Sequence, residues 1–305
     1  MSLRPLLLTQ GDPNGIGPEL ALKAWARREA DGLAPFALIG DPDVFARAAQ
    51  QIGMTAPLRH CTLDEVGALF PQHIPVIPLH GSPEEALVVA AIAEAVKHIH
   101  AGHARAIITN PISKASLYKT GFAYPGHTEF LGALAEEFWG VKAQPVMMIW
   151  SALLAVVPIT IHVPHADVPR LLTQDLVIET ARIVAHDLKE RFGIAKPRLA
   201  LAGLNPHAGE SGTIGREDED VLRPSVEALR TEGIAIAGPL SADTMFHAEA
   251  RKAYDVALCP THDQALIPAK TLAFDEGVNV TLGLPFVRTS PDHGTAPDIA
   301  GKGIA

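Results

Sequence analysis

Short apolar runs alternate with longer helix-like segments along this chain of 305 residues, and this alternation limits its fold most strongly. The runs at 5–9, 36–40, 105–110 and 198–203 are each separated from the next run by a segment long enough for a helix. Strands that alternate with helices are typical of βαβ units, in which the strands pair in parallel. We therefore predict an α/β fold with largely parallel sheets.

The segment 145–164, PVMMIWSALLAVVPITIHVP, contains no Asp, Glu, Lys or Arg. Its length approaches the ~20 residues of a membrane-spanning helix. Ser151 lies near its middle, however, and Pro158, Thr160 and His162 interrupt its second half. Because Val and Ile are also abundant there, we predict two adjacent buried strands rather than a membrane helix.

Two other segments carry helix signals. The segment 82–102 has Ser82 in the N-cap position, Pro83 at the first helical position and Glu85 three residues after the cap. The segment 175–193 has the apolar periodicity of an amphipathic helix. We predict a helix in each segment, followed in both cases by a strand.

The composition limits the partners of the chain. Hydrophobic residues make up 48% of it, enough for one large domain or two lobes. The formal net charge of −9 argues against a nucleic-acid surface, so an anionic substrate needs a local group of cations. Cys61 and Cys259 form no metal-binding spacing, and the apolar stretch in the start MSLRPLLLTQGDP is too short for a secretory signal. We expect a reduced, cytoplasmic protein that binds neither nucleic acid nor a membrane.

Three of the 14 histidines share one placement. His162, His207 and His262 each lie at or just beyond the C-terminal end of an apolar run that we predict to be a strand. In an open parallel sheet these ends line one edge, and ligands bind in the crevice there. Three imidazoles at one edge suit a divalent cation with room left for a substrate, although a single histidine is more often structural or solvent-facing.

A second group of residues indicates an anion site. His127 and Thr128 follow a Pro-Gly turn, and the alternative interpretation is a helix that Thr128 caps. Lys270, Asn279 and Arg288 follow one another at intervals of nine residues. Lysine supplies a compact positive charge for phosphate, and arginine grips a carboxylate or phosphate with two donors. A position at the surface would explain Lys270 equally well.

Two glycine-rich stretches differ in what they indicate. GDPNGIGPE, residues 11–19, has a G-x-G at Gly15 and Gly17 but lacks the third glycine of a dinucleotide-binding fingerprint. It is weak evidence for a Rossmann loop. DHGTAPDIAGKG, residues 292–303, is a loop of small residues, which brings backbone amides close to a nucleotide.

Together these motifs resemble the 4-hydroxythreonine-4-phosphate dehydrogenase family, NAD-dependent enzymes of pyridoxal phosphate biosynthesis. The strings that carry the resemblance are GDPNGIGPEL, PISKASLY, PGHTEFL, GLNPHAGE, GPLSADTMF, THDQALIPAK and GVNVTLGLPFVRTSPDHGTAPDIAGKG. HGTAP is also similar to the cofactor loop of isocitrate and isopropylmalate dehydrogenases. The implied fold is their two-lobed α/β/α sandwich with largely parallel sheets and an active site in the interlobe cleft. Residues 1–125 and 276–305 would form the cofactor-side lobe, and residues 126–275 the metal, substrate and dimerisation lobe.

The resemblance also assigns roles to individual positions. One metal ligand in that family comes from the partner subunit, which implies an obligate homodimer. The residues implied are the metal ligands His162, His207 and His262, the substrate contacts His127, Thr128, Lys270, Asn279 and Arg288, and the cofactor loop of Asp292, His293, Gly294, Thr295 and Ala296.

The implied reaction is the NAD(P)-dependent and metal-dependent oxidation of a small phosphorylated hydroxy acid, 4-phosphooxy-L-threonine. The product, 2-amino-3-oxo-4-phosphooxybutanoate, would decarboxylate to 3-amino-2-oxopropyl phosphate. A divalent metal on the C3 hydroxyl would favour its alkoxide, and the ligand set suits zinc first, with cobalt, nickel, manganese or magnesium as alternatives. Asp243 and Asp263 are candidates for accepting the proton or for orienting a ligand imidazole.

The sequence leaves other functions open. A dehydrogenase of threonate or erythronate 4-phosphate would keep the same metal and phosphate residues. A metal-dependent hydrolase would use the three histidines to activate water, but it leaves 292–303 without a role. Phosphate acyltransferases have a similar fold and no need for the histidines. The chain also departs from the family at Thr261, where Tyr is frequent, and at Asn14, where Ala is usual.

Overall fold

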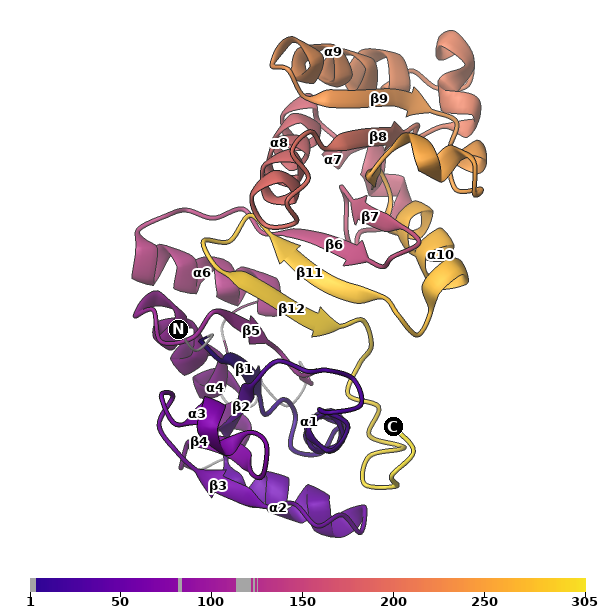
Figure 1. The fold of residues 1–305 in the computed structure, drawn as a ribbon. Coiled ribbons are helices and arrows are strands. Elements are labelled where there is room, and N and C mark those ends of the chain that lie inside the picture. Colours follow the sequence, from indigo (N-terminus) through magenta and orange to yellow (C-terminus); the bar gives the residue numbers. More distant parts are fainter. Residues whose placement is uncertain (1–3, 82–83, 114–121, 123, 125) are drawn as a thin grey trace. The chain divides into compact units, whose positions relative to one another are not determined.

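The chain forms two compact units (Figure 1). The structure, a computed structural model, describes residues 4–81, 84–113, 122, 124 and 126–305. Unit 1 comprises Met1–Pro145 with Leu284–Ala305, and unit 2 comprises Val146–Gly283. The chain therefore enters unit 2 once and returns once to unit 1.

This division differs from the lobes expected from the sequence at both junctions. Residues 126–145, expected in the second lobe, belong to unit 1, because the helix that starts at His127 packs into the apolar cluster of that unit. Residues 276–283, expected in the first lobe, belong to unit 2, because Val278–Leu282 pairs with Val146–Trp150 as a strand.

The described strands of unit 1 form a parallel sheet in the order β3-β4-β2-β1-β5-β12. The strands are β1 (Leu6–Thr9), β2 (Phe36–Gly40), β3 (Leu58–His60), β4 (Ile74–Pro78), β5 (Ala106–Ile108) and β12 (Val287–Pro291). The helices are α1 (Gly17–Ala26), α2 (Pro42–Gln51), α3 (Val66–Leu69), α4 (Glu84–His100) and α6 (His127–Trp139). Every pairing is parallel, as the alternation of strands and helices predicts.

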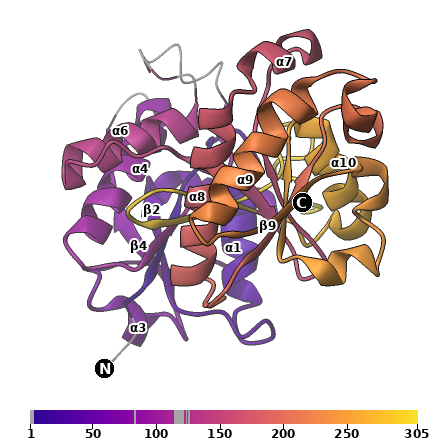
Figure 2. The same cartoon turned by 90° about the horizontal axis from the view of Figure 1, so that it is seen from above.

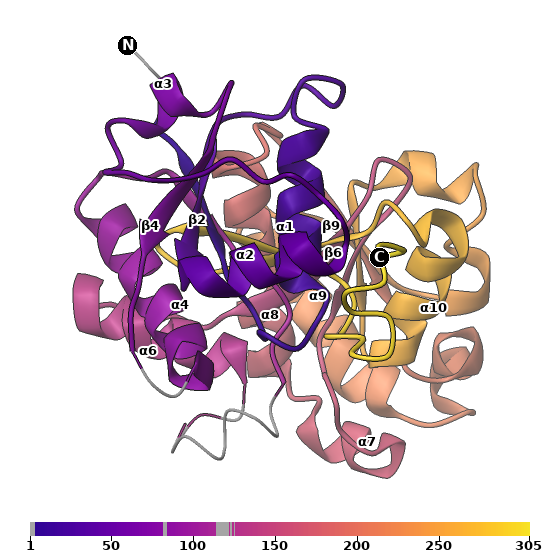
Figure 3. The ribbon, with the colours of Figure 1, turned by 90° about the horizontal axis from the view of Figure 1, so that it is seen from below.

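The sheet of unit 1 is buried on both faces, because neighbouring residues of each strand point to opposite sides. Leu7 packs with residues of α3, α4 and α6, whereas Leu8 packs with residues of α1 and α2. The two groups of helices therefore cover opposite faces of the sheet, as Figure 3 shows for α1 and α2 against α4 and α6. The predicted helix at 82–102 is present as α4, but its predicted caps Ser82 and Pro83 lie outside the described residues.

The described strands of unit 2 follow the order β11-β6-β7-β10-β8-β9. The strands are β6 (Val146–Trp150), β7 (Ala155–Pro158), β8 (Arg198–Ala202), β9 (Ala235–Leu240), β10 (Val256–Cys259) and β11 (Val278–Leu282). The helices are α7 (Val168–Leu171), α8 (Gln174–Glu190), α9 (Arg223–Thr231) and α10 (His262–Ala273). β7, β10, β8 and β9 are parallel neighbours, whereas β6 is antiparallel to both β7 and β11.

The charge-free segment at 145–164 contains the two predicted strands, β6 and β7. They form an antiparallel hairpin, in which Ile149 pairs with Val156. Ser151 closes the turn, since its Oγ accepts the backbone N–H of Leu154 at 3.1 Å. Among the described helices, none is long and apolar enough to cross a membrane.

Helices cover both faces of the sheet in unit 2 as well. Residues of α8 and α9 pack with Val157 and Leu258 on one face, and residues of α10 pack with Val156 and Ala257 on the other (Figure 2). β7 and β10 are buried at every position, which explains why their sequences read as continuous apolar runs.

Candidate functional site

The three histidines selected from the sequence follow three neighbouring parallel strands of unit 2. His162 comes after β7, His207 after β8, and His262 is the first residue of α10, just beyond β10. β10 pairs in parallel with both β7 and β8, so the C-terminal ends of the three strands lie at one edge. The expected placement at one sheet edge is therefore present.

His162 and His262 are neighbours, with ring centroids 5.4 Å apart. His262 Nδ1 lies 2.9 Å from Asp263 Oδ1, and the other oxygen of this carboxylate lies 3.7 Å from His165 Nε2. The hydrogen bond from His262 holds the pKa of the Asp263 carboxyl below its usual range. An imidazole that donates Nδ1–H to a carboxylate has Nε2 as its lone-pair nitrogen, which is how metal-ligating histidines are oriented.

His207 does not join this pair within one chain. In the described part of the chain, no three His, Cys, Asp or Glu side chains are grouped so that they could hold a metal ion. His162 and His262 fit a cation by their spacing and by the carboxylate behind His262, but they supply two imidazoles only. A complete site of three imidazoles needs a further donor.

His207 lies on a backbone segment of unusual conformation. His207, Ala208, Gly209, Glu210 and Ser211 all have positive φ angles, between 40° and 76°. A residue other than glycine costs about 1–2 kcal/mol in this left-handed conformation, so contacts around the segment must hold it. Backbone strain of this kind is concentrated at functional sites. His162 also has a positive φ, of 51°.

Gln264 links the loop of His262 to the loop of His207. The side chains of Thr261 and Gln264 form a capping box at the start of α10. The Nε2 of Gln264 then donates to the carbonyl oxygen of Gly203 at 2.8 Å, four residues before His207. Thr261, a position at which the chain departs from the family, therefore caps the helix of the candidate ligand.

A cavity of about 600 Å³ opens at this edge of unit 2. Its lining includes His165, Asp243, Asp263 and Gln264. Asp243 is exposed and accepts the hydroxyl of Ser241 at 2.7 Å. The two aspartates singled out from the sequence therefore line one cavity, but Asp263 also contacts two imidazoles.

Lys270 and Asn279 also belong to unit 2. Lys270 lies in the last turn of α10, with Nζ 5.6 Å from the centre of the Phe274 ring. Asn279 lies in β11, where its Oδ1 is buried and lacks a hydrogen-bond partner among the described residues. A buried acceptor without a hydrogen-bond partner costs free energy. A bound ligand that donates a hydrogen bond to it would remove this cost.

Arg288, the fifth proposed substrate residue in chain order, is a buried cation of unit 1. It lies in β12 and is 5% exposed. Its Nε and Nη2 donate to Thr109 Oγ1 at 3.0 and 2.7 Å, and Nη2 lies 3.4 Å from His127 Nδ1. Burial lowers the pKa of Arg288 to about 10, so the guanidinium remains charged at neutral pH. A charge held in this way attracts an anion.

His127 is neutral beside this guanidinium. Burial, and then the charge of Arg288, lower the pKa of His127 to about 3. Its Nε2 is buried and has no hydrogen-bond partner among the described residues, although the residue keeps some exposed surface. The interpretation of Thr128 as a helix cap is wrong, because α6 begins at His127 with Gly126 in the cap position. Thr128 lies in the first turn of this helix.

The predicted cofactor loop follows β12 at the C-terminal edge of the sheet of unit 1. Asp292 and Thr295 are half-buried and His293 is exposed, with its Nδ1 3.0 Å from the Gly294 carbonyl oxygen. Ala296 has a φ of 40°.

The glycine-rich stretch at 11–19 supports this cofactor loop. The backbone N–H of Ile16 donates to Thr295 O at 2.9 Å, and a Cβ at Gly15 would lie only 2.9 Å from that oxygen. Asn110 joins the stretch to β5, because its Nδ2 donates to the carbonyl oxygens of Thr9 and Gly17. Gly15 therefore allows close packing against the loop at 292–303, and Gly17 allows close packing against Asn110.

Several residues of these two sites carry no clear signal in the sequence. Thr109 and Asn110 form a polar pair directly after the apolar strand β5, which is the one pattern that could have selected them. His165 and Gln264 lie close to candidate ligands without any distinctive spacing. Asp218 is one of four consecutive acidic residues at 217–220, and only its burial distinguishes it.

Comparison with known proteins places this chain in a family. The family model described as "Pyridoxal phosphate biosynthetic protein PdxA" matches residues 33–305. The chain belongs to the PdxA family. It is 60% identical to a 4-hydroxythreonine-4-phosphate dehydrogenase of Methylorubrum extorquens, over 99% of this chain and 90% of that protein. A protein of the same name from Xanthobacter autotrophicus is 54% identical, over 99% of this chain and 89% of that protein.

A solved structure is similar to this PdxA-family chain as well. The crystal structure of a 4-hydroxythreonine-4-phosphate dehydrogenase from Klebsiella pneumoniae matches it with a TM-score of 0.87 and 34% sequence identity. The match covers 99% of this chain and 94% of that one. It confirms the predicted family and the predicted α/β fold with mostly parallel sheets and flanking helices.

Proposed function

We propose that this chain oxidises 4-phosphooxy-L-threonine to 2-amino-3-oxo-4-phosphooxybutanoate, which then loses CO2 to give 3-amino-2-oxopropyl phosphate. The observation that carries the proposal is the 60% identity with a named 4-hydroxythreonine-4-phosphate dehydrogenase over 99% of the chain. The product would serve pyridoxal 5′-phosphate biosynthesis, as the description of the family model indicates. A cytoplasmic location belongs to the same proposal.

Arg288 and His127 are proposed to bind an anionic group of the substrate. Thr109 fixes the guanidinium of Arg288, and the neutral His127 offers a buried ring nitrogen that lacks a protein partner among the described residues. The hydroxyl of Thr128 would add a donor. A fixed charge next to fixed dipoles binds a phosphate or carboxylate without reorganisation during the reaction.

Lys270 and Asn279 are proposed as the remaining substrate contacts. Lys270 supplies a second positive charge, which a substrate with both a phosphate and a carboxylate requires. The buried Oδ1 of Asn279 accepts a hydrogen bond, so it suits a hydroxyl or ammonium group of the substrate.

His162, His207 and His262 are proposed to hold a divalent cation, with zinc the first choice and cobalt, nickel, manganese or magnesium as alternatives. When bound, such a cation polarises the C3 hydroxyl, and NAD or NADP bound at Asp292–Ala296 accepts the hydride. Asp263 is proposed to orient His262, because its carboxylate already contacts two imidazoles. Asp243, which lines the same cavity, is then proposed to accept the hydroxyl proton.

The third imidazole is proposed to come from a second copy of this chain in a homodimer. His162 and His262 form a pair within one chain, and no third ligand joins them among the described residues. Ile267 in helix α10, which begins at His262, is a large apolar side chain that is 64% exposed, and Phe274, directly after the helix, is 75% exposed. Ile267 also lines the cavity beside Asp263, and an exposed apolar side chain there supports a partner surface.

The test is an assay of NADH formation with purified protein, 4-phosphooxy-L-threonine, NAD and each candidate metal in turn. Activity should appear with NAD or NADP, and it should disappear on chelation and return with added metal. Threonate and erythronate 4-phosphate, assayed in parallel, are the competing substrates. Faster turnover of either one would overturn the substrate assignment, and metal-dependent phosphate release without NAD would indicate a hydrolase instead.

A further inference from the structure

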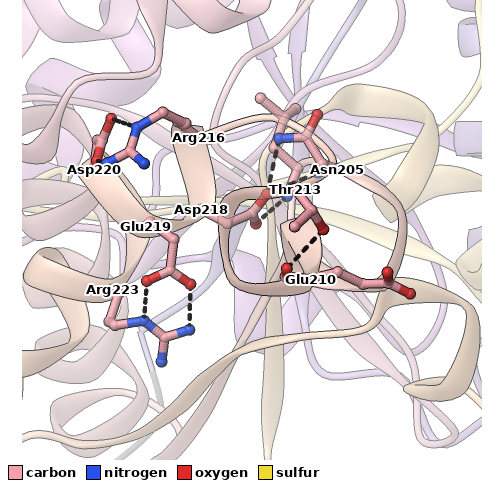
Figure 4. A network of polar contacts seen from close by, with 9 residues as sticks. Asn205, Glu210, Thr213, Arg216, Asp218, Glu219, Asp220 and Arg223 are labelled. Carbon is pink, nitrogen blue, oxygen red and sulfur yellow. Dashed lines mark hydrogen bonds and ion pairs between the residues drawn. The ribbon is translucent and has the colours of Figure 1, made fainter.

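One buried carboxylate closes the left-handed turn that carries His207. Asp218 is fully buried. It accepts the backbone N–H groups of Leu204 and Asn205 at 2.9 and 3.1 Å, and the side-chain Nδ2 of Asn205 at 2.9 Å (Figure 4). These donors lie directly before the turn and Asp218 lies after it. The carboxylate therefore joins the two ends of the segment.

The chain is wrapped closely around this carboxylate. A Cβ at Gly203 would lie 2.8 Å from Asp218 Oδ1, and a Cβ at Gly209 would lie 3.2 Å from Oδ2. Gly215 has a φ of 85°, and a Cβ there would lie 2.5 Å from Asn205 Nδ2. Glycine at these three positions is what lets the backbone approach the Asp218–Asn205 pair.

The acidic residues that follow Asp218 make different contacts. Asp220 pairs with Arg216 at 2.7 Å, and Glu219 pairs with Arg223 at 2.7 Å (Figure 4). Asp220 is exposed, and an ion pair of this kind adds little to stability. Asp218 instead directs its charge at backbone and amide donors inside the loop. Asp220 is consequently a matched control for a change at Asp218.

We propose that Asp218 is a positioning residue that fixes the turn on which His207 is presented to a divalent cation. This inference rests on the proposed function, in which His207 is a metal ligand. Asp218→Asn turns one of the two acceptor oxygens into an NH2 group, so the backbone N–H of either Leu204 or Asn205 then faces a donor. Without that acceptor the backbone relaxes toward the right-handed conformations that L-residues prefer. His207 then leaves the position in which it meets the cation.

The experiment measures the affinity of the metal-free, full-length protein for Co²⁺ by calorimetry, without substrate or NAD. Asp218→Asn keeps the size of the side chain, and we expect it to weaken Co²⁺ binding by about 10- to 100-fold, as for other residues behind metal ligands. The control Asp220→Asn should stay within about twofold of the wild type. Thermal unfolding verifies that each variant is folded at the temperature of the measurement.

A double variant separates positioning from general destabilisation. If Asp218 acts through His207, then Asp218→Asn adds no further loss of Co²⁺ affinity in a His207→Ala protein. An equal loss with and without His207, or wild-type affinity in Asp218→Asn, overturns the positioning role and leaves the metal proposal standing. Wild-type affinity in His207→Ala overturns the ligand assignment, and the positioning role with it. If Asp218→Asn does not fold, Asn205→Ser removes one of the three donors and carries the same test with a smaller expected loss.

Discussion

Thr109→Val removes the hydroxyl that holds the buried guanidinium of unit 1. Thr109 is fully buried, and its Oγ1 accepts Arg288 Nε at 3.0 Å and Nη2 at 2.7 Å. Valine has nearly the same shape as threonine, so the substitution leaves no cavity. The change therefore removes the acceptor of the Arg288 guanidinium and alters little else.

The expected cost follows from the contacts of this oxygen. A hydrogen bond to a charged group contributes about 1.5–3 kcal/mol, and here two N–H groups share one acceptor. The guanidinium is 5% exposed, so water does not replace the lost hydroxyl readily. We expect the free energy of unfolding of unit 1 to fall by about 3 kcal/mol. With a urea m-value of about 3 kcal/mol/M, the midpoint moves down by about 1 M.

The assay is urea unfolding followed by tryptophan fluorescence, since Trp25 and Trp139 both lie in unit 1. Thr109→Ser is the control, because it keeps Oγ, and it should stay within about 1 kcal/mol of the wild type. Thr109→Val should also raise the Michaelis constant for the phosphorylated substrate, whereas Thr109→Ser should not. An unfolding midpoint of Thr109→Val equal to that of the wild type would refute the role given to this hydroxyl.

Three further predictions concern the same two units. Burial lowers the pKa of His127 to about 3, so below pH 6.5 the unfolded chain binds a proton that the folded chain does not. The free energy of unfolding should therefore fall by up to about 1.4 kcal/mol per pH unit as the pH is lowered toward about 3. Urea midpoints measured across this range should show a shallower fall in His127→Gln, and equal slopes would contradict the assignment. Gly15→Ala would place a Cβ 2.9 Å from Thr295 O, so we expect the Michaelis constant for NAD to rise roughly tenfold while that for substrate is unchanged. Gly203→Ala would place a Cβ 2.7 Å from Ala208 Cα. We expect the free energy of unfolding, measured by thermal unfolding, to fall by about 1–3 kcal/mol. Wild-type stability would show that the turn shifts to accept the methyl group at little cost.

Much of the architecture could be predicted because its signals are local. A buried parallel strand reads as a short apolar run, so β1, β2, β8 and β10 could be located from their residues alone. The charge-free segment at 145–164 could be assigned to two strands for the same reason. The unit boundaries could not, since they depend on which helix packs against which sheet. α6 joins unit 1 through contacts with α4 that no local pattern encodes.

The residues of the candidate sites could likewise be predicted only where their signal is local. The sequence placed His162, His207 and His262 after strands, and parallel pairing then brings the ends of these strands to one edge. It did not indicate that His162 and His262 are neighbours while His207 lies on a separate left-handed turn. Nor did it distinguish the roles of Asp243 and Asp263, because the contact of Asp263 with His165 joins residues 98 positions apart.

The sequence by itself determined the family, the α/β class and the residue types available for binding an anion and a cation. Periodicity, strand ends and unusual strings of residues are properties of neighbouring positions, so they can be recognised in the sequence before the fold is known. Only the tertiary structure decided that His127 is neutral and that Arg288 is held by Thr109, which lies 179 residues away. Burial and long-range contact set the charge of a group and the direction of its donors, and both arise only when distant segments pack together.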